Sequence, residues 1–195
     1  MKDHQYCPVP ESLQPVLLRY SRSLLENAFS ERGGEAPGEP PAPTGEAIFL
    51  QPLGVFVTLR HGGELRGCIG SIAAEEPLVR ALRRRTLDAA FRDRRFSPLR
   101  AAELPEVTIE HSLLSPMQPL GRTDQIRIGV DGVVLTVGSG RALFLPEVAL
   151  QQRWDVAETL SALSLKAGLG GDGWRRDDAR FEVFQTQHYG EGNRL

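Results

Sequence analysis

Two stretches of β-forming residues, separated by a four-residue reversal, constrain the fold most strongly. The first stretch covers residues 54–59 and the second covers residues 65–72. The segment between them, His61-Gly62-Gly63-Glu64, contains the glycine pair that a tight two-residue turn needs. We therefore predict an antiparallel hairpin, in which Gly67 and Gly70 indicate a bulge or a close approach of another group to the second strand.

Further strands are predicted from the same kinds of pattern. Residues 107–114 alternate in side-chain type, as a strand does. Residues 126–130 and 133–137 flank Asp131-Gly132, a dipeptide typical of a type I′ hairpin. Shorter strands are expected at 141–145 and 181–184. Strands that follow one another as hairpins predict a largely antiparallel sheet.

Three longer helices are predicted between these strands. Apolar residues recur at steps of three and four in residues 11–30 and 75–92. A third helix begins at Asp155, which with Glu158 forms a capping-box pattern, and ends before Gly168. The expected fold class is α+β, and the nucleotide-binding patterns G-x-G-x-x-G and G-x-x-x-x-G-K-[ST] do not occur.

Length and charge exclude several classes of protein. The 195 residues fit a single domain, 1–195, with a Pro/Gly-rich loop or insertion at 33–46. The formal charge of −2 opposes general binding of nucleic acid. No apolar run reaches the roughly 20 residues of a membrane span, and the N-terminus lacks an apolar signal core. We expect a cytoplasmic protein with no membrane contact.

The metal-binding and disulfide classes are also excluded by the sequence. The two cysteines, Cys7 and Cys68, are too few for a disulfide scaffold or a Cys-rich zinc fold. The four histidines are widely spaced, so we predict neither a metal nor a cofactor.

The segment Leu65-Arg66-Gly67-Cys68-Ile69-Gly70 is the most unusual in the chain. Glycines leave the backbone accessible, and Arg66 would favour a thiolate at Cys68 or hold an anion. Cys68 is then a nucleophile or a ligand-binding thiol. The alternative is a buried cysteine that packs as a small hydrophobe between glycines.

Three other positions have both a functional and a structural interpretation. Glu110 shares a strand face with Ser112 and is either a general base or a solvated charge. His111, on the opposite face, is either a partner of Cys68 or a core histidine, and we favour the core. Lys166 is one of only two lysines and either acts chemically or interacts with a helix C-terminus.

The basic run from Arg80 to Arg95 also has two interpretations. Such a run can bind phosphate or RNA. Asp88 and Asp93 interrupt it, and no aromatic residues alternate with the arginines to stack on bases. A solvated helix face is therefore favoured, and nucleic acid is not an expected partner.

Several segments, in order, resemble the AMMECR domain family, whose bacterial branch is called AmmeMemoRadiSam system protein A. The hallmark Leu65–Gly70 is followed by matches to A-A-F-x-D-x-R-F-x-P-L at 89–99 and E-V-S-V-L at 110–114. Further matches are F-L-P-Q-V-A at 144–149 and L-C-x-K-A-G-L at 163–169. The chain departs from these patterns at His111, where the family has an apolar residue, and at Ser164, where it often has cysteine.

The resemblance implies an α+β fold of two lobes with a cleft between them. It places eight residues at or near that cleft: Arg66, Gly67, Cys68, Gly70, Arg95, Phe96, Glu110 and Lys166. It also implies a shared pathway with a Memo-like protein and a radical SAM protein. We expect an enzyme or accessory catalyst in which Cys68, Glu110 and Lys166 are catalytic and the other five bind ligand. A non-catalytic adaptor that binds a partner's peptide or modified residue is the alternative.

Overall fold

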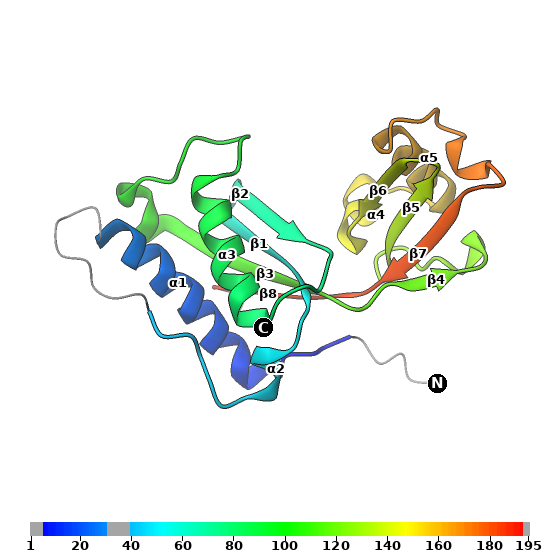
Figure 1. The fold of residues 1–195 in the computed structure, drawn as a ribbon. Helices are drawn as coiled ribbons and strands as arrows, with labels where there is room; N and C mark the ends of the chain where they lie inside the picture. Colours follow the sequence, from blue (N-terminus) through cyan, green and yellow to red (C-terminus); the bar gives the residue numbers. More distant parts are fainter. Residues whose placement is uncertain (1–5, 31–39, 193–195) are drawn as a thin grey trace. The chain divides into compact units, whose positions relative to one another are not determined.

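The structure is a computed structural model that describes residues 6–30 and 40–192. The chain separates into two compact units. Among the described residues, the major unit contains 7–30, 40–114 and 187–192, and the minor unit contains residue 6 and residues 115–186. Each unit has its own four-stranded sheet, with antiparallel pairing in both (Figure 1). The predicted α+β class is confirmed, although the strands form two sheets and not one.

The sheet of the major unit has the strand order β2-β1-β3-β8. Its strands are β1 (Gly54–His61), β2 (Glu64–Ser71), β3 (Val107–Leu114) and β8 (Thr186–Gly190). The predicted hairpin joins β1 to β2, and the turn residues Gly62 and Gly63 have φ of 58° and 85°. These left-handed conformations explain why two glycines occur together at this turn.

Two helices cover one face of this sheet (Figure 1). They are α1 (Gln14–Ser30), which follows the 3-10 turn η1 (Glu11–Leu13), and α3 (Leu78–Phe91). The helices and the sheet share a core that includes Leu17, Leu82, Val57 and Ile109, each fully buried. The major unit also contains the short helices α2 (Ala47–Leu50) and η3 (Ala101–Glu106).

The sheet of the minor unit has the order β4-β7-β5-β6. Its strands are β4 (Gln118–Leu120), β5 (Gly132–Val137), β6 (Gly140–Phe144) and β7 (Arg180–Phe184). Leu135 on β5 packs with Leu160 and Leu163 of helix α5 (Val156–Lys166). As predicted, α5 begins with a capping box: Glu158 N donates to Asp155 Oδ1, and Asp155 N donates to Glu158 Oε2.

The hairpin predicted around Asp131-Gly132 is wrong. Residues 126–130 form no strand, because the Asp131 carboxylate folds this stretch into a turn. Its oxygens accept from Arg127 N at 3.0 Å and from Arg127 Nη2 at 2.8 Å. The hairpin of this region is instead formed by β5 and β6, which Gly138, at φ 55°, and Ser139 connect.

Among the α-helices and strands, four have no counterpart in the sequence prediction: β4, β8, α2 and helix α4 (Pro146–Gln152). Pro146, which follows the strand predicted at 141–145, occupies the first turn of α4, where its missing N–H costs nothing. Of the predicted loop at 33–46, residues 33–39 lie outside the described residues, and residues 40–46 contain neither helix nor strand. None of the helices in residues 6–30 and 40–192 has both the length and the hydropathy of a membrane span.

Candidate functional site

Strand alternation gives the major sheet two different faces. Val55, Val57 and Leu59 of β1 point toward α1 and α3 and are buried. The residues between them point the other way, to a face that we call the outer face. It is formed by Phe56, Thr58 and Arg60 of β1, Cys68 and Gly70 of β2, Glu110 and Ser112 of β3, and His188 of β8.

Cys68, Thr58 and Glu110 form one row across the outer face. Thr58 is the register partner of both Cys68 on β2 and Glu110 on β3. Its Oγ1 donates a hydrogen bond to Cys68 Sγ at 3.3 Å. Because neighbouring strands lie about 4.8 Å apart, the Cys68 and Glu110 backbones are about 10 Å apart. The structure thus brings two of the predicted site residues onto one face, but not into hydrogen-bond contact.

Glu110 has its own polar neighbours on this face. Its Oε1 accepts from Arg60 Nε at 2.8 Å, and its Oε2 lies 4.0 Å from His188 Nε2. The other ring nitrogen of His188, Nδ1, is 3.1 Å from Ser112 Oγ. The side chain of Glu110 is four-fifths buried, and the hydrogen bond from Arg60 holds one of its carboxylate oxygens at a defined place. Across the described residues, no group of three His, Cys, Asp or Glu side chains is arranged as a metal site.

The backbone of Cys68 is fixed by Asp93 and Arg95, which lie just after α3. Because β2 is an edge strand, the outward N–H and C=O of Cys68 have no strand to bind. Cys68 N donates to Asp93 Oδ2 at 2.9 Å, and Cys68 O accepts from Arg95 Nη2 at 3.0 Å. Arg95 Nε and Nη2 also bind the two oxygens of Asp93, at 3.0 and 2.8 Å. This ion pair replaces a fifth strand at the position of Cys68.

The electrostatics of this ion pair keep both groups charged. The hydrogen bond from Arg95, with the backbone donors of Cys68 and Arg95, lowers the pKa of Asp93 to about 2. Asp93 in turn raises the pKa of Arg95. The Arg95 guanidinium lies 5.5 Å from the centre of the Phe96 ring, and its side chain is 57% exposed. Arg95 therefore both fixes the β2 backbone and presents a charge at the surface.

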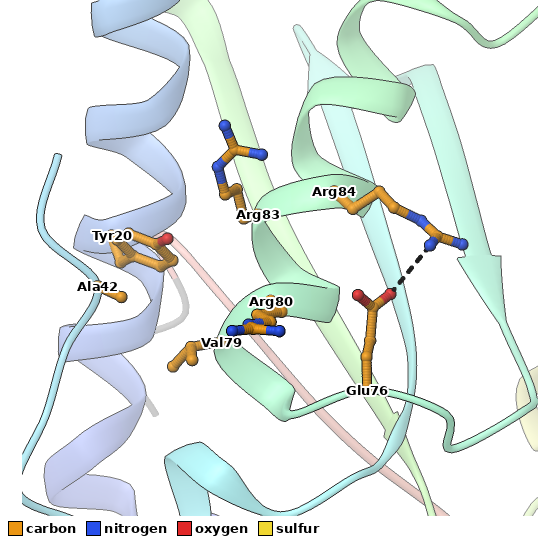
Figure 2. Close-up of a pocket in the computed structure, with 7 residues that line it drawn as sticks. All are labelled: Tyr20, Ala42, Glu76, Val79, Arg80, Arg83 and Arg84. Atoms are coloured by element: carbon orange, nitrogen blue, oxygen red, sulfur yellow. Dashed lines mark ion pairs between the residues drawn. The ribbon is translucent and has the colours of Figure 1, made fainter. Parts of the chain in front are cut away.

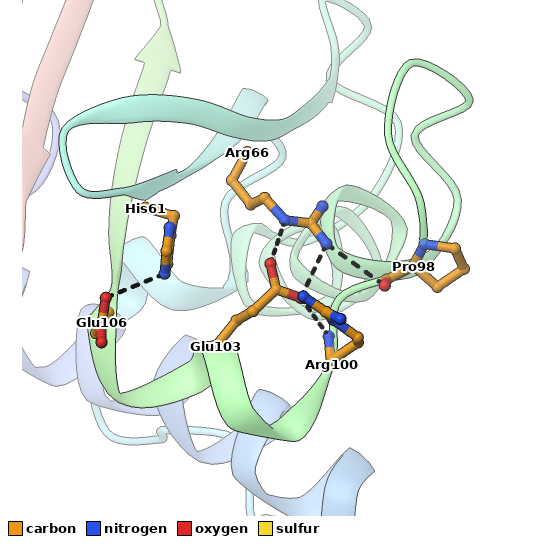
Figure 3. Close-up of polar contacts among 6 residues, drawn as sticks. All are labelled: His61, Arg66, Pro98, Arg100, Glu103 and Glu106. Carbon is orange, nitrogen blue, oxygen red and sulfur yellow. Dashed lines mark hydrogen bonds and ion pairs between the residues drawn. The ribbon is translucent and has the colours of Figure 1, made fainter.

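Arg66 is used in a second ion pair (Figure 3). Its Nε and Nη2 donate to the two oxygens of Glu103, at 2.8 and 3.2 Å, and both side chains are nearly buried. Glu103 also accepts from Arg100 N, and the Arg66 hydrogen bond lowers the pKa of Glu103 to about 2. The predicted anion-binding role of Arg66 thus competes with an internal carboxylate that already occupies its planar fork.

Gly67 and Gly70 are each in close contact with a neighbouring group. A Cβ on Gly67 would lie 2.2 Å from the carbonyl oxygen of Ala89 in α3. A Cβ on Gly70 would lie 2.2 Å from the ring of Phe56, its cross-strand partner, and 2.6 Å from Val55 O. The close approach expected from these glycines is real, but the approaching groups in the structure belong to the protein.

His111 lies on the opposite face from Cys68 and is fully buried. Its Nε2 is 3.0 Å from Ser21 Oγ, which accepts from Thr86 Oγ1, and its Nδ1 is 3.3 Å from Tyr189 OH. Burial, with a smaller effect of His188, lowers the pKa of His111 to about 3. The favoured interpretation of a core histidine agrees with this placement.

Lys166 belongs to the minor unit, at the end of α5. Its Nζ donates to Leu143 O at 2.9 Å and lies 4.7 Å from the centre of the Phe144 ring. Burial lowers its pKa. The ammonium is thus held by contacts within its own unit, and its predicted catalytic role stays a prediction, as does the cleft.

Thr58, Asp93 and Glu103 are important to this site, yet the sequence prediction did not select them. Asp93 was seen only as an interruption of a basic run. The sequence feature that could have identified Asp93 is its position two residues before Arg95, because a short loop lets the two side chains pair. For Thr58 the signal was the register of the hairpin, which is fixed by the turn at Gly62-Gly63.

Comparisons with known proteins all point to one protein family. A family model described as AMMECR1 matches residues 18–189. A protein of Methanothermobacter thermautotrophicus is 34% identical over 96% of this chain and 98% of its own length. Protein MJ0810 of Methanocaldococcus jannaschii is 34% identical over 89% of this chain and 88% of its own. The crystal structure of uncharacterized protein PH0010 from Pyrococcus horikoshii superimposes with a TM-score of 0.83 at 28% identity, covering 95% of both chains.

Proposed function

The chain belongs to the AMMECR1 family, and we propose that it is an accessory catalyst whose working group is the thiol of Cys68. The observation that carries this proposal is the fixed position of Cys68 on the outer face. Asp93 and Arg95 hold its backbone from the sheet edge, and Thr58 holds its sulfur from the neighbouring strand. Such an arrangement restricts where the sulfur can lie, which is what a nucleophile needs.

In this proposal Cys68 is the nucleophile and Glu110 is the acid or base, at the two ends of the row that Thr58 joins. The thiol proton leaves to solvent and the sulfur adds to a carbonyl carbon of the substrate. The S–C bond forms as the C=O π bond breaks, and its electron pair moves to the carbonyl oxygen, which takes up a proton. Glu110 acts as acid or base at the other end of a substrate that lies across Thr58, since about 10 Å separates the two strands that carry them. Lys166 is proposed as a further residue that stabilises negative charge, to be tested separately.

The proposed partners are a Memo-like protein and a radical SAM protein in one pathway. A non-catalytic adaptor for these partners is the second candidate. It is favoured by the internal ion pairs of Arg66 and Arg95, because these guanidiniums already bind carboxylates of the protein itself. In the adaptor, the outer face would bind a partner's peptide, and Cys68 would contribute only its shape and its hydrogen bond.

Alkylation of the thiol tests the first requirement of catalysis. Cys7 is exposed and would also react, so the background is Cys7→Ser. With iodoacetamide we expect one added group by mass spectrometry in Cys7→Ser, and none after the further change Cys68→Ser. Failure of Cys68 to react in the folded protein would contradict the nucleophile.

Pathway activity then separates catalyst from adaptor. The measured quantity is product formation by the reconstituted pathway, with copurification of the partners as the control for binding. For a catalyst, Cys68→Ser abolishes product while the partners still copurify, and Glu110→Gln, which keeps the geometry toward Arg60, lowers the rate and flattens its pH profile. Full activity of Cys68→Ser would establish the adaptor instead.

A further inference from the structure

Most charged clusters of the major unit, among its described residues, pair an arginine with a carboxylate. One example lies in the hollow between α1 and α3, where Arg84 Nη1 is 3.5 Å from Glu76 Oε1 (Figure 2). Arginine and carboxylate side chains ordinarily keep their charges at neutral pH, so such pairs hold structure and do not exchange protons. The cluster on the outer face differs, because it contains a histidine, His188 of β8, beside the carboxylate of Glu110.

Both ring nitrogens of His188 face polar groups of β3. Its Nδ1 lies 3.1 Å from the Oγ of Ser112, which is buried, and its Nε2 lies 4.0 Å from Glu110 Oε2. The His188 side chain is 46% exposed. The ring is therefore oriented by Ser112 at one nitrogen, faces Glu110 with the other, and is open to solvent.

Glu110 itself has little access to water. Its side chain is 20% exposed, and its Oε1 accepts from Arg60 Nε. The stem of the side chain lies against β8, since a Cβ on Gly190 would come within 3.0 Å of Glu110 Cγ. Oε2 is thus the oxygen left for proton exchange, and His188 is the group that faces it.

A second histidine–glutamate pair provides a comparison. His61 Nε2, at the end of β1, lies 3.2 Å from Glu106 Oε2, and the His61 side chain is 39% exposed. Glu106 is 73% exposed, so its carboxylate exchanges protons with water directly. Strand alternation also turns His61 away from the outer face, because Arg60 before it points there. His61 therefore resembles His188 in exposure and neighbour but lies outside the proposed site.

We propose that His188 carries protons between solvent and Glu110, an inference that rests on the acid–base role proposed for Glu110. When Glu110 acts as a base, its Oε2 takes a proton from the substrate or from water, and the carboxylate becomes a carboxylic acid. The O–H bond of this acid then breaks, and the proton passes to Nε2 of the neutral His188 ring. The resulting imidazolium releases the proton to solvent. When Glu110 acts as an acid, the same steps run in reverse.

Histidine suits this role because its side chain takes up and releases protons near neutral pH. The 4.0 Å separation between His188 and Glu110 is longer than a hydrogen bond, and catalytic contacts of this kind tighten when substrate binds. Two other charged or titratable groups are near. Arg60 lies beyond Glu110 and keeps its proton. His111, on the opposite face, has a pKa lowered to about 3 by burial and by His188, so it stays neutral. Glu110 is the neighbour with which His188 exchanges a proton.

Hydrolysis of p-nitrophenyl acetate by the full chain, in the Cys7→Ser background, tests this relay. In the burst, the Cys68 sulfur adds to the acetyl carbonyl, and p-nitrophenolate leaves with the electron pair of its C–O bond. In the steady state, water attacks the thioacetate carbon, its proton goes to Glu110, and the S–C bond breaks to release the thiolate. We expect His188→Gln to keep the burst and to slow the steady state about 100-fold, the lower end of the range for acid–base catalysis. The rate of Cys68→Ser is subtracted as the background.

Two further measurements separate proton transfer from a structural effect. The steady-state rate of His188→Gln should lose its dependence on pH between about 5 and 8, whereas the matched control His61→Gln should keep the burst, the rate and the pH profile. In His188→Ala, imidazole added to the buffer should restore part of the steady-state rate, because the missing ring lies at the surface. Imidazole should not accelerate His61→Ala.

Each failure has its own result. The absence of a burst in Cys7→Ser would contradict Cys68 as the nucleophile, and the relay with it. A burst followed by an unchanged steady state in His188→Gln would contradict the relay alone. A burst with no steady state in Cys7→Ser would do the same, since Glu110 would then accept no proton. A slow His188→Ala that imidazole does not accelerate would assign His188 to structure.

Discussion

The same short segments of the major sheet contribute to both of its faces, and their residues have different roles on each face. On the helix-covered face, Gly67 lies against the Ala89 carbonyl and His111 is enclosed with Ser21 and Tyr189. Cys68, the residue after Gly67, and Glu110, the residue before His111, point to the outer face, where they lie in one polar row with Thr58. Adjacent residues of one sequence motif therefore have different roles: one residue holds the fold and the next presents chemistry.

This difference changes how a motif of this kind is interpreted. The glycines and arginines of Leu65–Gly70 suggest a ligand-binding loop, but Gly67, Gly70 and Arg66 all contact other parts of the protein. Cys68 is the residue that these contacts position. The variants below test whether the helix-covered face determines stability while the outer face determines the reactivity of Cys68.

The largest effect is expected for Gly67→Ala on the helix-covered face. The new Cβ would meet a backbone carbonyl of α3 at 2.2 Å, and α3 must move to relieve the clash. Overpacking of this kind costs about 3 kcal/mol or more when backbone has to shift. Urea denaturation measures the loss, and Gly170→Ala, where a Cβ meets nothing within 4 Å, is the control. Equal stability of the two variants would contradict this account of Gly67.

Asp93→Ala should come next, with a loss of about 2–3 kcal/mol at pH 7, because it removes the acceptor of Cys68 N and the partner of Arg95. The pKa of Asp93 is lowered from 3.8 to about 2, so its stabilisation is present above pH 4 and lost as pH falls through 2. The difference between variant and wild type should shrink over that window.

The control for Asp93 is Asp124, which also pairs with an arginine two residues away but is 61% exposed. Asp124→Ala should cost less than about 1 kcal/mol. If Asp93→Ala is equally mild, the edge of β2 does not depend on this ion pair, and the outer face is less fixed than the geometry indicates.

His111→Val should remove a pH dependence from the core. Folded His111 stays neutral because its pKa is about 3, whereas in the unfolded chain it takes up a proton below about 6.5. Stability should therefore fall as pH drops from 6.5 toward 3, by about 1.4 kcal/mol per pH unit for one proton. In the valine variant this contribution should be absent between pH 6.5 and 5, above the range in which Asp93 and Glu103 lose their own stabilisation. The change His61→Gln, at a partly exposed site, should retain it.

Thr58→Val should have the smallest effect on stability, below about 1 kcal/mol, since it removes one hydrogen bond at a half-buried position. Its effect belongs to the outer face: the sulfur of Cys68 loses the contact that positions it. The rate of iodoacetamide labelling should change in this variant and stay constant in Thr108→Val. An unchanged rate in both would show that Thr58 does not influence the thiol.

Much of the fold follows from local patterns in the sequence. The glycine pair at 62–63, the capping box at Asp155, and the periodicity of residues 11–30 each act within a few residues. The turn, the helix start and the helix that they predict are confirmed, with α1 itself beginning at Gln14 after a 3-10 turn. The prediction at Asp131 failed for a local reason as well. Its side chain binds Arg127, and this side-chain hydrogen bond competes with the strand.

The sequence by itself determined which residues share a face: Glu110 with Ser112, and His111 opposite them, because strand alternation has a period of two. Only the tertiary structure decided which face receives the helices, and with it that His111 is buried and Cys68 lies in the outer row. It also brought Asp93 and Arg95 to the backbone of Cys68, more than twenty residues earlier in the chain. That contact depends on where α3 ends over the edge of β2, and no local pattern specifies the meeting of two distant segments.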